Sequence, residues 1–174
     1  VVVGTNDVPT VDATSAAFAE LPNEIGSGTP HEASGTITFT DVDLTDRPVA
    51  SAVFTSFTFE PAVNNVANSL TAAQLAAIAA VQAPLTVTQA AGNTNNGSAS
   101  WSYSVPDSAF DFLAEGEGLT LTYTATVDDG HGGVVTKPLT ITVTGSNDAV
   151  EITSGAQTAA IAEIAATHGS GQVD

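Results

Sequence analysis

Residues 119 to 127 alternate strictly between apolar and hydroxyl side chains, and this pattern constrains the fold more than any other feature of the sequence. Every second position is apolar, the set being Leu119, Leu121, Tyr123, Ala125 and Val127, and threonine fills the positions between them. Because successive side chains of a β-strand point to opposite faces, the pattern predicts a strand with one buried and one solvated face.

Further strands are predicted wherever the same alternation returns between clusters of Gly, Asn, Asp and Pro, which favour turns. The expected strands are Thr10–Leu21, Gly35–Thr40, Val49–Phe59, Leu85–Gln89, Ser98–Val105, Leu119–Val127 and Val134–Thr144. Several short strands of this kind, separated by turns, are typical of two sheets packed face to face. The sequence therefore predicts an all-β, Ig-like antiparallel β-sandwich of about seven strands.

One segment, Ser69–Gln82, departs from the strand pattern and is predicted to form a short inserted helix. Thr71 and Gln74 have the spacing of a capping box. The apolar residues of one helical face are Leu70, Ala73, Ile78 and Val81. Two interpretations remain open: the helix covers a sheet edge, or the insertion at 60–97, with its Asn-rich loop, binds a glycan or a protein.

The charge balance restricts the partners. The 174 residues include 19 acidic side chains but only two basic ones, Arg47 and Lys137, which gives a net charge of -17. Nucleic acids and anionic membranes are excluded as partners, because both require clustered Lys and Arg. No apolar run approaches the roughly 18 residues that membrane insertion needs. A compact chain this acidic repels itself, so bound counter-ions, above all divalent cations, are expected.

A repeat indicates how the chain is organised. Residues 1–7 reappear as 141–148, and the similarity continues from Phe18–Leu21 to Ile161–Ile164. We therefore expect 1–7 to end a preceding repeat, 8–148 to form one module, and 149–174 to begin the next copy. The chain opens without a signal peptide, as expected for a piece of a tandem array, and we expect it to be a monomer in isolation.

Four motifs occur in a specific order: Gly35–Asp43, then Trp101–Tyr103, then Asp128–Gly133, then Gly145–Asp148. In that order they resemble the VCBS repeats of large bacterial RTX-type surface proteins, which are similar to cadherin-like and other Ig-like adhesin modules. The resemblance implies type I secretion, a place on the bacterial cell surface, and a role in cell adhesion and biofilm attachment. The stretch at 60–96 is longer than a typical member would have.

Acidic and amide side chains fall on loops that an Ig-like sandwich collects at its two ends, and such oxygen ligands are what calcium requires. One end is expected to gather Asn6, Asp7, Asp41, Asp43, Asp46, Asp128 and Asp129. The other end is expected to gather Glu20, Glu115, Glu117, Asn147 and Asp148. Cadherin-like junctions distribute their Ca²⁺ ligands similarly, so each end would be half of a site completed by a neighbouring repeat. The competing interpretation is that these residues only form turns.

Catalysis is not expected. The chain has no cysteine and no Gly-x-Ser-x-Gly elbow, and its histidines, His31, His131 and His168, are too scattered to predict a histidine metal site. Asp107 and Asp111 could imitate glycosidase carboxylates with Glu115 and Glu117, but they follow Pro106 in a turn without an aromatic cleft. The sequence thus predicts a calcium-binding structural extender of a secreted adhesin, with a ligand-binding module as the alternative.

Overall fold

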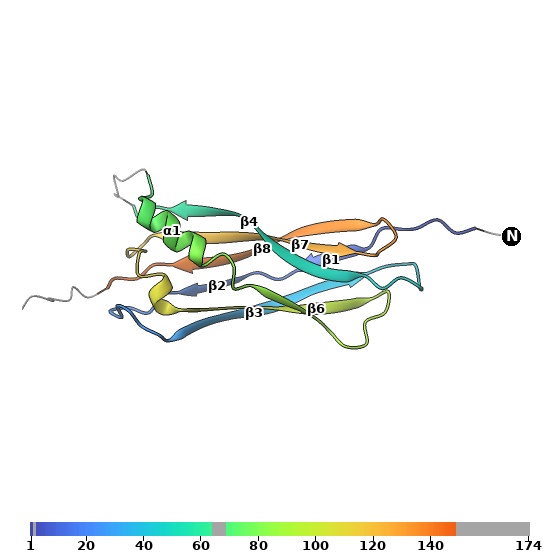
Figure 1. Cartoon of the computed structure of the whole chain (residues 1–174), viewed down its shortest axis with the longest axis horizontal. Coiled ribbons are helices and arrows are strands. Elements are labelled where there is room, and N and C mark those ends of the chain that lie inside the picture. Colours follow the sequence, from blue (N-terminus) through green and yellow to red (C-terminus); the bar gives the residue numbers. More distant parts are fainter. Residues whose placement is uncertain (2, 64–68, 149–174) are drawn as a thin grey trace, which may run out of the picture.

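The computed structural model describes residues 1, 3–63 and 69–148, so the expected start of a second copy at 149–174 lies outside the described residues. The elements are β1 (Thr10–Ala13), β2 (Ala16–Ala19), β3 (Pro30–Thr40), β4 (Val49–Glu60), α1 (Ala72–Ala80), β5 (Thr86–Gln89), β6 (Gly97–Pro106), the 3-10 turn η1 (Asp107–Ala109), β7 (Gly118–Asp128) and β8 (Val134–Thr144). They form an elongated body whose two ends are built from loops (Figure 1).

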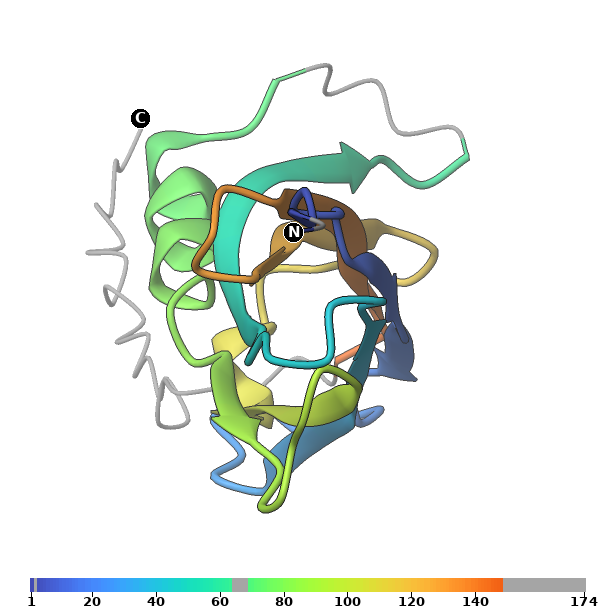
Figure 2. The same cartoon turned by 90° about the vertical axis from the view of Figure 1, so that its right-hand side faces the viewer.

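Two four-stranded sheets face each other, with the orders β1-β3-β6-β5 and β2-β8-β7-β4. Lettered along the chain, this is the immunoglobulin arrangement of strands A, B, E and D opposite C, F and G. Figure 2, which looks along the body, shows the two sheets enclosing a common interior. The prediction of an all-β Ig-like sandwich with one inserted helix is confirmed.

The prediction of a single first strand at Thr10–Leu21 is wrong, because the chain changes sheets at Thr14 and Ser15. β1 pairs antiparallel with β3, whereas β2 pairs in parallel with β8, so the sandwich has eight strands and is not purely antiparallel. The crossing is held on both sides: the Thr14 amide donates to the carbonyl of Thr36, and the Thr140 amide donates to Ser15 Oγ. The third strand also begins at Pro30, earlier than the predicted Gly35.

The interior is built as the alternation predicts. Along β7 the residues Leu119, Leu121, Tyr123, Ala125 and Val127 are all buried, and the threonines between them are partly exposed. β6 contributes Trp101 and Tyr103 from the opposite sheet, and β8 contributes Leu139, Ile141 and Val143. Burying this apolar surface is the main favourable contribution to folding.

The helix α1 covers one open side of the sandwich. The predicted capping box is present, since Thr71 Oγ1 accepts from the Gln74 amide at 3.2 Å and Gln74 Oε1 accepts from the Thr71 amide at 2.9 Å. Ile78 and Val81 are buried. Figure 2 shows α1 beside β4 at the edge of the sandwich. Within the described part of the chain, no helix is long and apolar enough to cross a bilayer.

Two tyrosines fasten the end of the helix, one from each sheet. Tyr103 donates its hydroxyl to the carbonyl of Val81 at 2.9 Å, and Tyr123 donates to the carbonyl of Gln82 at 3.0 Å. Burial raises the pKa of the Tyr123 hydroxyl to about 12, so both residues donate as neutral phenols at ordinary pH. These contacts favour the interpretation of α1 as a cover for the sheet edge.

Candidate cation sites at the two poles

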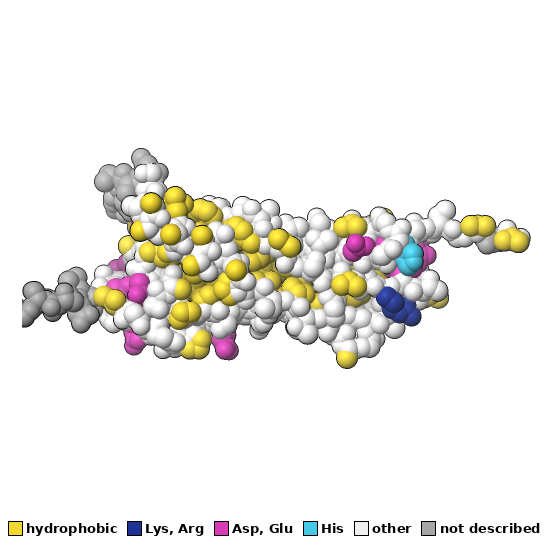
Figure 3. Space-filling model, in the orientation of Figure 1, with side chains coloured by type: hydrophobic (Ala, Val, Ile, Leu, Met, Phe, Trp, Pro, Cys, Tyr) yellow, Lys and Arg dark blue, Asp and Glu magenta, His cyan; other side chains and the backbone are white. Residues whose placement is uncertain are grey.

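The acidic residues gather at opposite ends of the long axis. We call the end where the chain begins the N-terminal pole, and the end where the described chain finishes the C-terminal pole. Figure 3 shows Asp and Glu side chains at both ends of one face, separated by a largely uncharged middle. Like charges brought together in this way repel each other unless a counter-ion binds.

Three separate segments meet at the N-terminal pole: the chain before β1, the β3–β4 loop and the β7–β8 turn. The Asp7 amide donates to Asp43 Oδ2 at 2.7 Å, and Asn6 Nδ2 donates to Asp129 Oδ2 at 2.9 Å. Asp128 is the last residue of β7 and is exposed, and its Oδ1 accepts from the Gly130 amide at 2.8 Å. The structure therefore brings Asn6, Asp7, Asp43 and Asp129 to one end, whereas Asp128 stabilises the turn through its hydrogen bond.

One group at this pole consists of Asp41, Asp43 and Asp46, which each offer a carboxylate oxygen within 4.8 Å of the others. Asp41 is 6% exposed and Asp46 is 4% exposed. Both have a buried Oδ2 for which the structure shows no hydrogen-bond partner. A buried carboxylate oxygen without a partner is costly, so these two atoms are candidate ligands for a cation.

The Asn-rich loop forms hydrogen bonds with Asp41 of this group. Asn95 is buried and donates its side-chain amide to the carbonyl of Asp41 at 2.6 Å. The Asp41 amide in turn lies 3.1 Å from the Asn95 carbonyl and 3.2 Å from Asn96 Oδ1. These two asparagines are thus engaged within the module and hold the β3–β4 loop in place.

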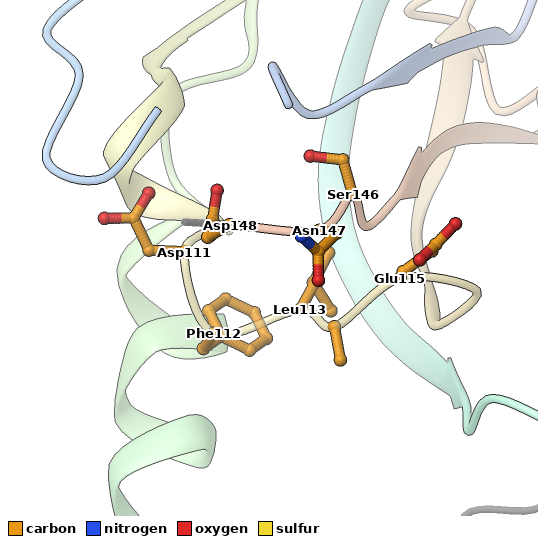
Figure 4. Close-up of a pocket in the computed structure, with 8 residues that line it drawn as sticks. Asp111, Phe112, Leu113, Glu115, Ser146, Asn147 and Asp148 are labelled. Atoms are coloured by element: carbon orange, nitrogen blue, oxygen red, sulfur yellow. The ribbon is translucent and has the colours of Figure 1, made fainter. Parts of the chain in front are cut away.

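At the C-terminal pole, Glu20, Asp111 and Asp148 each offer a carboxylate oxygen within 4.8 Å of the others. Glu20 follows β2, Asp111 follows η1, and Asp148 lies beyond β8. Figure 4 shows Asp111 and Asp148 next to each other at one side of a hollow. Residues at this pole also have buried oxygens without a hydrogen-bond partner: Glu20 Oε1, Asp107 Oδ2, Asp111 Oδ1, Ser146 Oγ and Asp148 Oδ1.

The other residues predicted for this pole have different positions. Glu117 is buried and accepts from the Ala114 amide through Oε2 at 3.0 Å, so it stabilises its own loop. Glu115 is exposed and lies apart from Asp111 and Asp148 in Figure 4. Asn147 is exposed, and its carbonyl accepts from the Asn23 amide at 3.0 Å. Of the five predicted residues, the structure joins Glu20 and Asp148 in one group.

Asp107 and Asp111 are the residues that sequence reasoning set aside. Asp107 is fully buried, and its Oδ1 accepts from the Leu21 amide at 2.9 Å while lying against His31 Nε2. Asp111 Oδ2 accepts from the Gly26 amide at 2.9 Å. The signal was available, because both aspartates belong to the same interstrand loop as Glu115 and therefore to the same pole.

Crowding of carboxylates changes their protonation. The pKa of Glu20 is raised to about 7: burial is the largest cause, the hydrogen bond from the Ser146 amide opposes it, and the charges of Asp148, Asp107 and Asp111 add to the rise. Burial also raises the pKa of Asp148, with a further contribution from Asp111. At the N-terminal pole the hydrogen bond from Asn6 lowers the pKa of Asp129, so that carboxylate stays ionised. Without a cation, Glu20 at the C-terminal pole is therefore expected to carry a proton below a pH of about 7.

This proton gives a testable pH dependence. A carboxyl with a raised pKa in the fold binds its proton more tightly there than in the unfolded chain, so Glu20 favours folding at low pH. That contribution is lost as the pH rises from about 4.5 through about 7. Urea unfolding in EDTA at pH 5, 6, 7 and 8 should show a falling free energy of unfolding across this window. A flat profile in EDTA would contradict the prediction, and saturating calcium should remove the fall.

No family model matches the chain, and no curated protein matches it. Among solved structures, the chain is similar to the ASH/PapD-like domain 7 of human CEP192, with 9% identity, a TM-score of 0.43 and coverage of 86% of this chain and 92% of that one. It is also similar to AggA, the major subunit of aggregative adherence fimbriae type I from Escherichia coli, with 14% identity, a TM-score of 0.43 and coverage of 82% and 97%. Likenesses this distant bring no function to the chain.

Proposed function

We propose that this chain is a calcium-binding structural module of a secreted bacterial surface adhesin, in which Ca²⁺ at the poles stiffens an array of repeats. The observation that carries the proposal is the convergence of buried carboxylate oxygens without hydrogen-bond partners at both ends of the module. Their grouping with further carboxylates supports cation binding at each end. A lone acidic turn residue would keep its oxygens in water, where they cost nothing.

The donor set favours calcium. Ca²⁺ takes six to eight oxygen ligands in flexible geometry, whereas Mg²⁺ demands a near-ideal octahedron and keeps several waters. Asp41, Asp43 and Asp46 would hold the ion at the N-terminal pole. Glu20, Asp111 and Asp148 would hold it at the C-terminal pole. Bound there, the cation would supply the positive charge that the crowded carboxylates lack.

The placement of the poles supports an array. Because they lie at opposite ends of the long axis, modules joined in series would set a C-terminal pole against the next N-terminal pole (Figure 1). The three carboxylates of each group are fewer than the ligands calcium takes, so a neighbouring repeat or water would complete the shell. Ca²⁺ at the junction would cancel the repulsion between acidic loops and fix the angle between repeats. A rod of this kind would carry an adhesive region away from the cell and support biofilm attachment.

A thermal melt tests the proposal. Extracellular calcium modules bind with Kd on the order of 10⁻⁴ to 10⁻³ M. A site saturated at about 100 times its Kd adds roughly 2.7 kcal/mol of stability. We therefore expect the melting temperature to rise by about 5–10 °C between EDTA and saturating calcium. Magnesium at the same concentration serves as the control and should give a clearly smaller rise.

Equal melting temperatures in EDTA and calcium would contradict the proposal for the isolated module. The same melt on two modules in series then decides whether the sites need a neighbour. If two modules show no calcium response either, the stiffening role fails.

A further inference from the structure

One histidine lies at the N-terminal pole beside carboxylates, although the spread of histidines along the sequence predicts no histidine site. His131 belongs to the β7–β8 turn, Asp129 precedes it in the same turn, and Asp46 comes from the β3–β4 loop. A ring nitrogen of His131 and one carboxylate oxygen from each aspartate lie within 4.8 Å of one another. This group differs in chemistry from the all-carboxylate group nearby, because it contains nitrogen.

The spacing suits two ligands of a common ion. His131 Nδ1 and Asp46 Oδ1 are 3.3 Å apart. A charge-assisted hydrogen bond would be shorter, about 2.7–2.9 Å. In a tetrahedral zinc site, bond lengths of about 2.0–2.2 Å place neighbouring ligand atoms about 3.4 Å apart. The observed distance therefore already matches that between ligands of one metal ion.

Asp46 and Asp129 differ in the features that suit them to bind a metal ion. Asp46 is 4% exposed, and its Oδ2 is buried without a hydrogen-bond partner. Asp129 is held by three donors, since Oδ1 accepts from the amides of His131 and Gly133 and Oδ2 accepts from Asn6. Hydrogen bonds of this kind orient metal ligands in known sites.

The third ligand, His131, is exposed to solvent. The side chain of His131 is 59% exposed and borders a hollow that it shares with Asn6, Asp43 and Asp46. A metal held by the three side chains would therefore keep an open position, as in zinc sites with three protein ligands. Water or a group from another molecule could fill that position.

We propose that Asp46, Asp129 and His131 form a site for a divalent first-row transition ion of the zinc class. Imidazole suits these metals, whereas calcium prefers an all-oxygen shell. The proposal goes beyond the calcium sites of the proposed function and shares Asp46 with the N-terminal one. The two cations are thus neighbours at this pole and are distinguished by the nitrogen ligand.

Zinc titration of the metal-free full chain tests the site, with calorimetry for affinity and long-range ¹H–¹⁵N spectra for the histidine rings. We expect Zn²⁺ to shift the His131 ring nitrogens, with the other histidines as internal references. His131→Gln should weaken zinc binding by about 100-fold or more, because it removes a direct ligand. The exposed Asp12, paired with Lys137 at 3.3 Å, offers the control Asp12→Asn, which should bind zinc normally.

Two outcomes separate this proposal from the calcium sites. Zinc affinity that survives His131→Gln, together with unshifted His131 ring signals, would overturn the transition-metal site. The calcium-induced rise in melting temperature should be the same in His131→Gln as in the wild type. If that rise is absent from both while zinc still shifts the His131 ring, the calcium proposal fails for the isolated module and the zinc site stands. The melt of His131→Gln in EDTA verifies that the exposed substitution leaves the fold intact.

Discussion

Trp101→Ala is expected to lower the free energy of unfolding by about 3–5 kcal/mol, the largest effect of any single substitution that we propose. Trp101 is fully buried, and its Nε1 donates to the carbonyl of Thr14 at 3.1 Å, where the chain changes sheets. A Cβ atom on Gly35 would lie 2.7 Å from the ring, so the indole packs directly on that backbone. The alanine variant would leave a cavity and an unpaired carbonyl at the crossing point.

Urea unfolding at neutral pH measures this loss. Single domains have total stabilities of only about 5–15 kcal/mol, so Trp101→Ala should fall near the limit of folding at 37 °C. Val53→Ala is the matched control, because Val53 is apolar but 67% exposed on β4. We expect that variant to stay within about 0.5 kcal/mol of the wild type. A loss below about 1 kcal/mol for Trp101→Ala would contradict its central place in the core.

Glu20→Gln is expected to have opposite effects in EDTA and in calcium. In EDTA at pH 8, above the raised pKa of Glu20, the neutral amide removes one buried charge and can donate to the unpartnered oxygens of Asp111 and Asp148, so the fold should gain about 1–3 kcal/mol. In saturating calcium the variant lacks a carboxylate ligand, so it should lose most of the roughly 2.7 kcal/mol that one occupied site contributes. The curves of wild type and variant would therefore cross as calcium is added.

Calcium titrations followed by urea unfolding reveal such a crossing. Glu32→Gln is the control, since Glu32 is an exposed glutamate on β3 that belongs to neither carboxylate group. It removes the same charge and should shift stability by no more than about 0.5 kcal/mol in either buffer. If Glu20→Gln is destabilising in EDTA as well as in calcium, Glu20 serves the fold through its bond to Ser146 rather than through a cation.

Much of the architecture was predictable because its signals are local. The alternation along β7 indicates which side chains enter the core, and the capping box of Thr71 and Gln74 is present at the start of α1, although the helix begins at Ala72 rather than at the predicted Ser69. The gathering of Asn6, Asp43 and Asp129 at one end also followed from strand order, since loops at the same end of a sandwich are neighbours.

The break at Thr14 and Ser15 was not predictable from residues 10–21. Both halves of that segment carry ordinary strand residues, and the change of sheet depends on partners far along the chain, including Thr36, Trp101 and Thr140. The parallel pairing of β2 with β8 follows from that change. The contacts of buried Asp107 were not predictable for the same reason, because its partners Leu21 and His31 are distant in sequence.

By itself, the sequence determined the all-β class, the approximate positions of most strands, the short helix and the two acidic ends. These follow from side-chain periodicity, turn chemistry and charge, which act over a few residues. Only the tertiary structure decided which carboxylates are buried, which oxygens lack partners, and which residues of a loop face one another. Burial and distance arise from packing of segments far apart in the chain. No local pattern could therefore predict that Asp46 is buried and Asp128 exposed, or that His131 lies next to Asp46.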